Sequence, residues 1–149
     1  MSKVQFYFED VNPVKIKKTY LRKKINSLII NELKQKGEIS IIFCSDTYLL
    51  KINEQYLNHH YYTDIITFDY VENSVISGDL FISIDRVKEN AEKYKTEFIE
   101  EIYSVVFHGI LHLTGYDDKS ESEQKLMKEK EDYYLNEVDF REENYDTKI

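Results

Sequence analysis

Residues 97–118 read EFIEEIYSVVFHGILHLTGYDD and contain two of the chain's four histidines. Apolar side chains recur at helical spacing from Phe98 onward and surround the stretch near its end, which predicts a central, buried helix over 97–113. His108 and His112 stand four residues apart, so both imidazoles project from the same face of this helix, one turn apart. Two nitrogen ligands in this arrangement are typical of a metal site.

A third ligand must come from beyond the helix, because the chain has to turn back to reach the same metal ion. Gly115 stands where a left-handed residue ends a helix, and Asp118 follows it three residues later. Metzincin proteases space three ligands in the same way, and a carboxylate is an acceptable zinc ligand. The pattern therefore predicts a site of His108, His112 and Asp118, with Asp117 as the competitor for the third position.

Three protein ligands leave a metal-bound water available as the nucleophile of a hydrolase, because the metal brings the pKa of that water toward about 7. Zincin proteases carry a general-base glutamate directly after the first histidine, whereas this chain has Gly109 there. The sequence thus favours a hydrolase whose substrate is not a peptide. One zinc ion per chain is expected, and the carboxylate ligand makes Mn²⁺ or Mg²⁺ the alternatives.

The chain has 149 residues, 42 % of them hydrophobic, which suits one compact domain over residues 1–149. The lone cysteine, Cys44, excludes an internal disulfide framework and is typical of a reducing compartment. The first residues lack the apolar segment of a signal peptide, and no apolar run is long enough to span a membrane. We therefore expect a soluble, cytoplasmic protein without a membrane partner.

The net charge of −8 is unevenly distributed and argues against strong nonspecific binding of nucleic acid. Residues 1–36, in contrast, hold nine Lys or Arg and only three Asp or Glu. The alternatives for this basic segment are a solvated helix face and a contact with RNA phosphates. The RNA hypothesis assigns that contact to Lys17, Lys18, Arg22, Lys23 and Lys24.

Periodicity predicts four strands and about five helices. The strands are expected over 4–9, 38–44, 64–70 and 75–83, and the short turn at 72–74 indicates that the last two pair antiparallel. The helices are expected over 17–35 (ended by Gly37), 46–56 (capped by Asp46), 85–94, 97–113 and from a capping box at Ser120–Glu123 to about 135. Residues 57–62 are expected to form a loop, and 136–149 a loose tail apart from Val138 and Phe140.

The segment "HGILHLTGYDD" (108–118) resembles the HGxLHLxGYDH signature of the YbeY family of metal-dependent endoribonucleases. Further matches lie upstream, in "INEQY" (52–56), "YYTDIITFDY" (61–70) and "SGDLFIS" (77–83), and together they cover roughly residues 38–135. The resemblance implies an α/β, α+β-like domain with a mixed four-stranded sheet, a central ligand helix and a zincin-like site layout. It implies a zinc-dependent nuclease of single-stranded RNA in small-subunit (16S) rRNA 3′ maturation and ribosome quality control.

Carried over by position, the family's first two zinc-binding histidines fall on His108 and His112, and its third ligand, usually His, falls on Asp118. The family's usual arginine is replaced by Leu57, and its proline before Thr63 by Tyr62; the cations His59, His60 and Arg86 are candidates to replace the arginine. Asp64 and Asp79 are candidates to orient a ligand histidine, or are turn residues. Aromatic residues near the cleft, Tyr61 among them, are candidates to stack on RNA bases.

Two rival functions remain open in the sequence. One is a metal-dependent hydrolase of another substrate, such as a small ester. The other is a ribosome-assembly factor that binds rRNA, the small subunit or its proteins with little catalytic power, a reading supported by Leu57 and the acidic net charge. Turnover that depends on the metal separates an enzyme from a binding factor.

Overall fold

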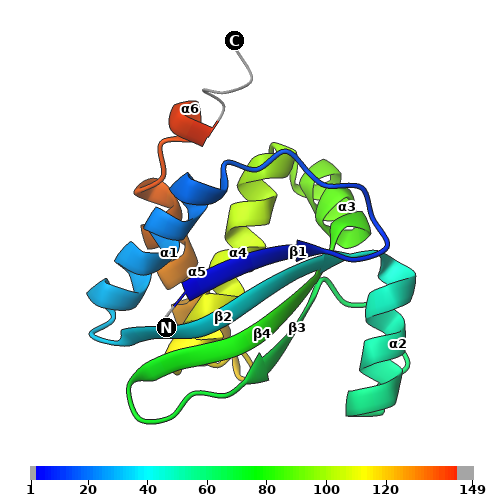
Figure 1. The fold of residues 1–149 in the computed structure, drawn as a ribbon, viewed down its shortest axis with the longest axis horizontal. Coiled ribbons are helices and arrows are strands. Elements are labelled where there is room, and N and C mark those ends of the chain that lie inside the picture. The colour runs from blue at the N-terminus through cyan, green and yellow to red at the C-terminus, as the bar shows by residue number, and fades with distance from the viewer. Residues whose placement is uncertain (1–2, 144–149) are drawn as a thin grey trace.

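A four-stranded mixed sheet of order β1-β2-β4-β3 lies at the centre of the fold (Figure 1). The structure is a computed structural model that describes residues 3–143. Within that range the strands are β1 (Lys3–Phe8), β2 (Gln35–Cys44), β3 (Ile65–Asp69) and β4 (Val75–Ser83). The helices of the same range are α1 (Lys18–Asn31), α2 (Asp46–Leu57), α3 (Ile84–Tyr94), α4 (Phe98–Thr114), α5 (Glu121–Asn136) and α6 (Phe140–Glu143).

The strand pairing confirms the expected mixed sheet. β1 pairs parallel with β2 and β2 pairs parallel with β4, whereas β3 pairs antiparallel with β4. The hairpin between β3 and β4 turns at Asn73, which takes a left-handed backbone conformation with φ 57°. Short polar turns of this kind join antiparallel neighbours, as the sequence predicted.

Helices cover the two faces of the sheet unequally (Figure 1). α1 and α4 pack on one face, where they enclose the larger hydrophobic core, and α5 packs on α4. α2 packs on the other face against β3 and β4, with Leu49 and Ile52 beside Ile66 in a smaller core. α4 is therefore central, as predicted, and most of its side chains are buried.

The start of α4 differs by one residue from the prediction. Glu97 is its N-cap and forms a capping box with Glu100. The capping box at Ser120 and Glu123 is also present and opens α5. These local signals are strong because each satisfies backbone N–H groups that the helix cannot bond itself.

Two predicted helix boundaries were wrong. The first helix ends at Asn31 because Leu33 turns left-handed (φ 61°) and Gln35 already bonds to Ser74 of the neighbouring hairpin. Gly37 consequently lies inside β2 and not at a helix end. In the second case Ser45, not Asp46, caps α2, since its side chain accepts a hydrogen bond from the backbone N–H of Tyr48.

The tail is ordered further than expected. Val138 is buried, and Phe140 opens α6 and packs edge-on against Tyr103 of α4, with 5.3 Å between ring centroids. Glu143 is buried and accepts hydrogen bonds from the Tyr103 hydroxyl and the Lys17 backbone N–H. These contacts fix residues 137–143 to the N-terminal ends of α1 and α4, so the prediction of a loose tail is wrong for them; the rest of the predicted tail, 144–149, lies outside the described residues.

Candidate metal centre

The side chains of His108, His112 and Asp118 converge on one point. The Nε2 atoms of the two histidines are 3.1 Å apart, and one Asp118 carboxylate oxygen lies 3.2 Å from Nε2 of His108 and 3.4 Å from Nε2 of His112. A tetrahedral zinc ion with bonds of about 2.0–2.2 Å separates neighbouring ligand atoms by about 3.3–3.6 Å. The observed triangle is close to these separations, so His108, His112 and Asp118 would serve as three ligands of such a site.

The turn after α4 brings the carboxylate to the histidines. Gly115 ends the helix with φ 117°, and its N–H and that of Tyr116 bond to the carbonyls of His112 and Leu111. Asp117 is exposed and Asp118 is half-buried beside the imidazoles. Geometry thus favours Asp118 over its neighbour as the third ligand.

A buried glutamate of α5 fixes the orientation of the first histidine. Glu131 Oε2 lies 2.7 Å from Nδ1 of His108, and the glutamate side chain is only 11 % exposed. A carboxylate can only accept, so Nδ1 carries the proton and the lone pair of Nε2 faces the metal position. Burial lowers the pKa of His108, but the carboxylates of Glu131, Asp118 and Asp64 outweigh it, and the net shift in the metal-free protein is upward.

Sequence reasoning missed Glu131. It lies 23 residues after His108 on another helix, inside a run of charged residues that looks like a solvated helix face. A weak sequence signal exists, because Glu131 falls on the same helical stripe as the apolar residues Met127 and Tyr134. In the structure all three side chains are buried.

A cavity of about 280 Å³ opens beside His108 and is lined by α3, α4, α5 and the residues that lead into β3. Asp64 and Glu101 both line it. Burial raises the pKa of the Asp64 carboxyl, and burial together with the charges of Asp64 and Glu131 raises the pKa of Glu101. In the metal-free protein, the cavity therefore presents two carboxyl groups that hold a proton more readily than usual beside His108.

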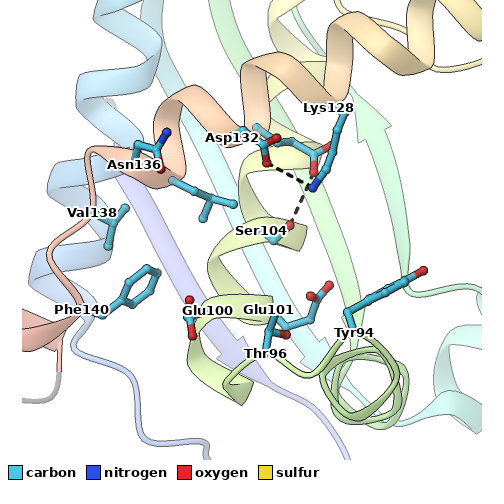
Figure 2. A pocket seen from close by; sticks show the side chains of 12 residues that line it. Tyr94, Thr96, Glu100, Glu101, Ser104, Lys128, Asp132, Asn136, Val138 and Phe140 are labelled. Atoms are coloured by element: carbon cyan, nitrogen blue, oxygen red, sulfur yellow. Dashed lines mark hydrogen bonds and ion pairs between the residues drawn. The ribbon is translucent and has the colours of Figure 1, made fainter.

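A larger hollow of about 820 Å³ adjoins this cavity between α4 and α5 (Figure 2). Tyr94, Glu101, Ser104 and Glu131 line both. The walls of the hollow also carry Glu100 and Asp132, and its lysine, Lys128, is ion-paired to Asp132 at 3.1 Å. Its charge is unfavourable for phosphate groups.

The two candidate orienting aspartates lie in different places. Asp64 lines the cavity of His108 and accepts a hydrogen bond from Asn90 at 3.4 Å. Asp79 lies on β4 between Gly78 and Leu80, which face α4, so its side chain points to the opposite face, where Tyr70 donates to it at 3.2 Å. Only Asp64 is brought to the histidines.

The predicted RNA contacts are also separated from the cavity, which they do not line. α1 packs over β2, away from the β3 edge, and several basic side chains of α1 and of its N-cap, Lys17, have partners. Arg22 Nε donates to the Val4 carbonyl at 2.8 Å, Lys24 Nζ donates to the Glu137 carbonyl at 2.8 Å, and Lys17 Nζ donates to the Glu142 carbonyl at 3.4 Å. Tyr61, in contrast, lies on the exposed loop only three residues before Asp64, which lines the cavity.

Comparison with known proteins gives a consistent result. The family model of endoribonuclease YbeY matches residues 7–139. An endoribonuclease YbeY of Parabacteroides distasonis is 48 % identical over 132 residues, covering 89 % of this chain and 93 % of the relative. One of Flavobacterium psychrophilum is 52 % identical over 111 residues, covering 74 % and 79 %. A solution structure of a Thermotoga maritima protein superposes with a TM-score of 0.65 at 27 % identity, covering 91 % and 88 % of the two chains. The chain therefore belongs to the endoribonuclease YbeY family.

Proposed function

We propose that this endoribonuclease is a metal-dependent hydrolase of single-stranded RNA whose metal ion is held by His108, His112 and Asp118. The observation that carries the proposal is the triangle of ligand atoms, with sides of 3.1, 3.2 and 3.4 Å. Zinc fits this set of two imidazoles and one carboxylate, and the carboxylate also suits Mn²⁺ or Mg²⁺. When bound, the ion would supply a Lewis acid that activates water and polarises the phosphodiester.

The remaining chemistry falls to residues around the cavity. Glu131 holds the His108 ring in the tautomer that presents Nε2, and Asn90 holds the Asp64 carboxylate beside it. Asp64 and Glu101 line the cavity beside His108 and are the carboxyl groups placed to exchange a proton with the RNA. The adjoining acidic hollow disfavours the RNA backbone and so limits the directions in which a strand can leave.

We further propose that the RNA is the 3′ region of small-subunit rRNA, that the protein acts with the small ribosomal subunit, and that it does so in the cytoplasm. The likeness to the YbeY family supports this assignment. In the described residues 3–143, no helix is long and apolar enough to cross a membrane.

The test joins metal content to activity. Purified protein is assayed by elemental analysis and by cleavage of single-stranded RNA, before and after chelation, with casein as a control substrate. We expect about one metal per chain, RNA cleavage that chelation abolishes and zinc restores, and intact casein. RNA binding without metal-dependent cleavage, in a protein that retains its metal, would instead identify a non-catalytic assembly factor. His112→Ala should lose both metal and cleavage.

A further inference from the structure

The loop between α2 and β3, residues 58–64, carries two exposed tyrosines in fixed positions. Tyr61 and Tyr62 are 57 % and 51 % exposed, and each ring contacts a neighbouring side chain. The Tyr61 ring stacks on His59, with 5.2 Å between centroids and 20° between planes, and its hydroxyl lies 3.1 Å from His59 Nδ1. The guanidinium of Arg86 lies 4.9 Å from the centroid of the Tyr62 ring. Each ring is therefore held by a neighbour while about half of it faces solvent.

A buried asparagine holds the backbone of this tyrosine loop from both sides. Asn53 of α2 is 2 % exposed, its carbonyl accepts from the N–H of His59 at 3.0 Å, and its side-chain amide donates to the carbonyl of Tyr61 at 2.8 Å. The carbonyl of Asp64 in turn accepts from the backbone N–H of Ser83 at 2.9 Å. A loop fixed at these points loses little conformational entropy when a ligand lies on it.

The tyrosine loop leads directly into the metal cavity. Its last residue, Asp64, lines the cavity of His108, and so does Asn90, which lies one helical turn after Arg86 on α3. The contact between Tyr62 and Arg86 therefore lies one helical turn along α3 from a residue of the cavity wall.

The charges around the cavity distinguish this rim from the other side. In the loop, 58–64, only Asp64 is acidic, whereas the hollow between α4 and α5 is lined by one lysine and four acidic residues, Glu100, Glu101, Glu131 and Asp132. The charge of Arg86 is already compensated by Asp46 at 3.1 Å and Glu89 at 3.5 Å, so its guanidinium serves to position Tyr62. The loop thus offers aromatic surface with little net charge.

We propose that Tyr61 and Tyr62 form a stacking platform for unpaired bases of the RNA strand as it leaves the metal cavity, away from the acidic hollow. Base–aromatic stacking is independent of sequence and needs unstacked bases, so the platform would select single strands without selecting a base. This inference rests on the proposed RNA substrate and deepens it: affinity beside the cavity comes from stacking and not from charge.

The test measures binding separately from cleavage. Anisotropy of a labelled single-stranded oligodeoxynucleotide of about 8–12 nucleotides, checked on a gel for integrity, gives Kd for the metal-loaded wild type and variants. Tyr62→Leu and Tyr61→Leu should each weaken binding by about 5- to 150-fold, the range that corresponds to the loss of one stacked base. Tyr62→Phe, which keeps the ring, should bind like the wild type. Tyr133→Leu on α5, where a tyrosine of similar exposure (52 %) lies away from the cavity, is the matched control.

Two further measurements distinguish stacking from other effects on binding. The slope of log Kd against log salt should stay the same in the leucine variants, because no phosphate contact is removed. An oligonucleotide with abasic sites should bind wild type and leucine variants equally. The platform would be overturned if the leucine substitutions weakened binding of the abasic strand as much as binding of the intact strand. It would also be overturned if both leucine variants bound the intact strand like the wild type while their circular dichroism showed the same fold. Failure of the nuclease proposal appears instead in RNA turnover, which this binding assay does not use.

Discussion

Removing the carboxylate of Glu131 should weaken metal binding although Glu131 is not itself a ligand. Its Oε2 lies 2.7 Å from Nδ1 of His108 in a site where the glutamate is only 11 % exposed, so solvent does little to screen the interaction. Replacing the hydrogen-bond partner of a ligating histidine costs about 10- to 100-fold in metal affinity. We therefore expect Glu131→Ala to raise the Kd for zinc by about 100-fold and Glu131→Gln by about tenfold, because the amide oxygen still accepts the Nδ1 proton.

The assay is zinc competition against a chromophoric chelator, accompanied by thermal melting with and without zinc. A loss of 10- to 100-fold in affinity equals about 1.4–2.7 kcal/mol of metal-linked stability. For a chain of this size, that loss should reduce the zinc-induced rise in Tm by about 3–10 °C. The melting readout does not depend on catalytic activity.

Asp132→Asn is the matched control, since this residue follows Glu131 on α5 but is 54 % exposed and ion-paired to Lys128. It should bind zinc like the wild type. If Glu131→Ala held zinc within about twofold of the wild type, the orienting role assigned to this glutamate from its hydrogen bond with His108 would be refuted. If the control lost as much affinity, the effect would be one of general charge.

Four further outcomes are expected. Asp118→Ala should lose most bound metal by elemental analysis and Asp117→Ala little; equal retention would remove the basis for the third ligand. Gly109→Ala should lower the free energy of unfolding by about 1–3 kcal/mol despite the better helix propensity of alanine, because its Cβ would lie 1.8 Å from a leucine methyl of β4. Burial raises the pKa of the Glu32 carboxyl, but hydrogen bonds from Tyr116 and Tyr134 and the charge of Lys130 lower it below its ordinary value of 4.5. Glu32→Gln should therefore show its full loss of stability relative to the wild type at pH 7, and urea titrations should show that loss shrinking as the pH falls below about 4.5. Lys23→Ala should reduce the salt slope of RNA binding by about 0.7 if α1 contacts phosphates, and an unchanged slope would make α1 a solvated face.

The convergence of His108, His112 and Asp118 could be predicted from the sequence because the signal is local. A helix fixes the relation of His108 to His112, and Gly115 marks the turn that returns Asp118, so no knowledge of distant packing is needed. The antiparallel hairpin of β3 and β4 is local for the same reason. The parallel pairing of β1 with β2 and of β2 with β4, in contrast, joins segments separated by whole helices.

The residues that sequence reasoning missed are charged groups buried by distant partners. Glu143 belongs to an acidic stretch that looks solvated, yet it is buried against Tyr103, a residue 40 positions earlier. Glu131 is a similar case. A carboxylate is recognised as buried only once its donor is known, and the donor here lies on another helix. The basic side chains at α1 likewise have partners that the sequence did not reveal. Lys17, Arg22 and Lys24 donate to backbone carbonyls of β1 and of the C-terminal segment, which are distant in the sequence.

Gly109, the residue after the first histidine, has a packing role that the sequence did not reveal. Its position after the first histidine suggested only that a protease's general base is absent. In the structure, position 109 faces the sheet, where a Cβ would lie 1.8 Å from Leu80 Cδ2 and 2.8 Å from Ile65 Cδ1. A glutamate there would force α4 away from β4 and would displace the histidines that α4 carries. The proton chemistry of this site must therefore come from other positions. Asp64, at the entry to β3, and Glu101, two turns before His108 on α4, are carboxyls with raised pKa values that line the cavity.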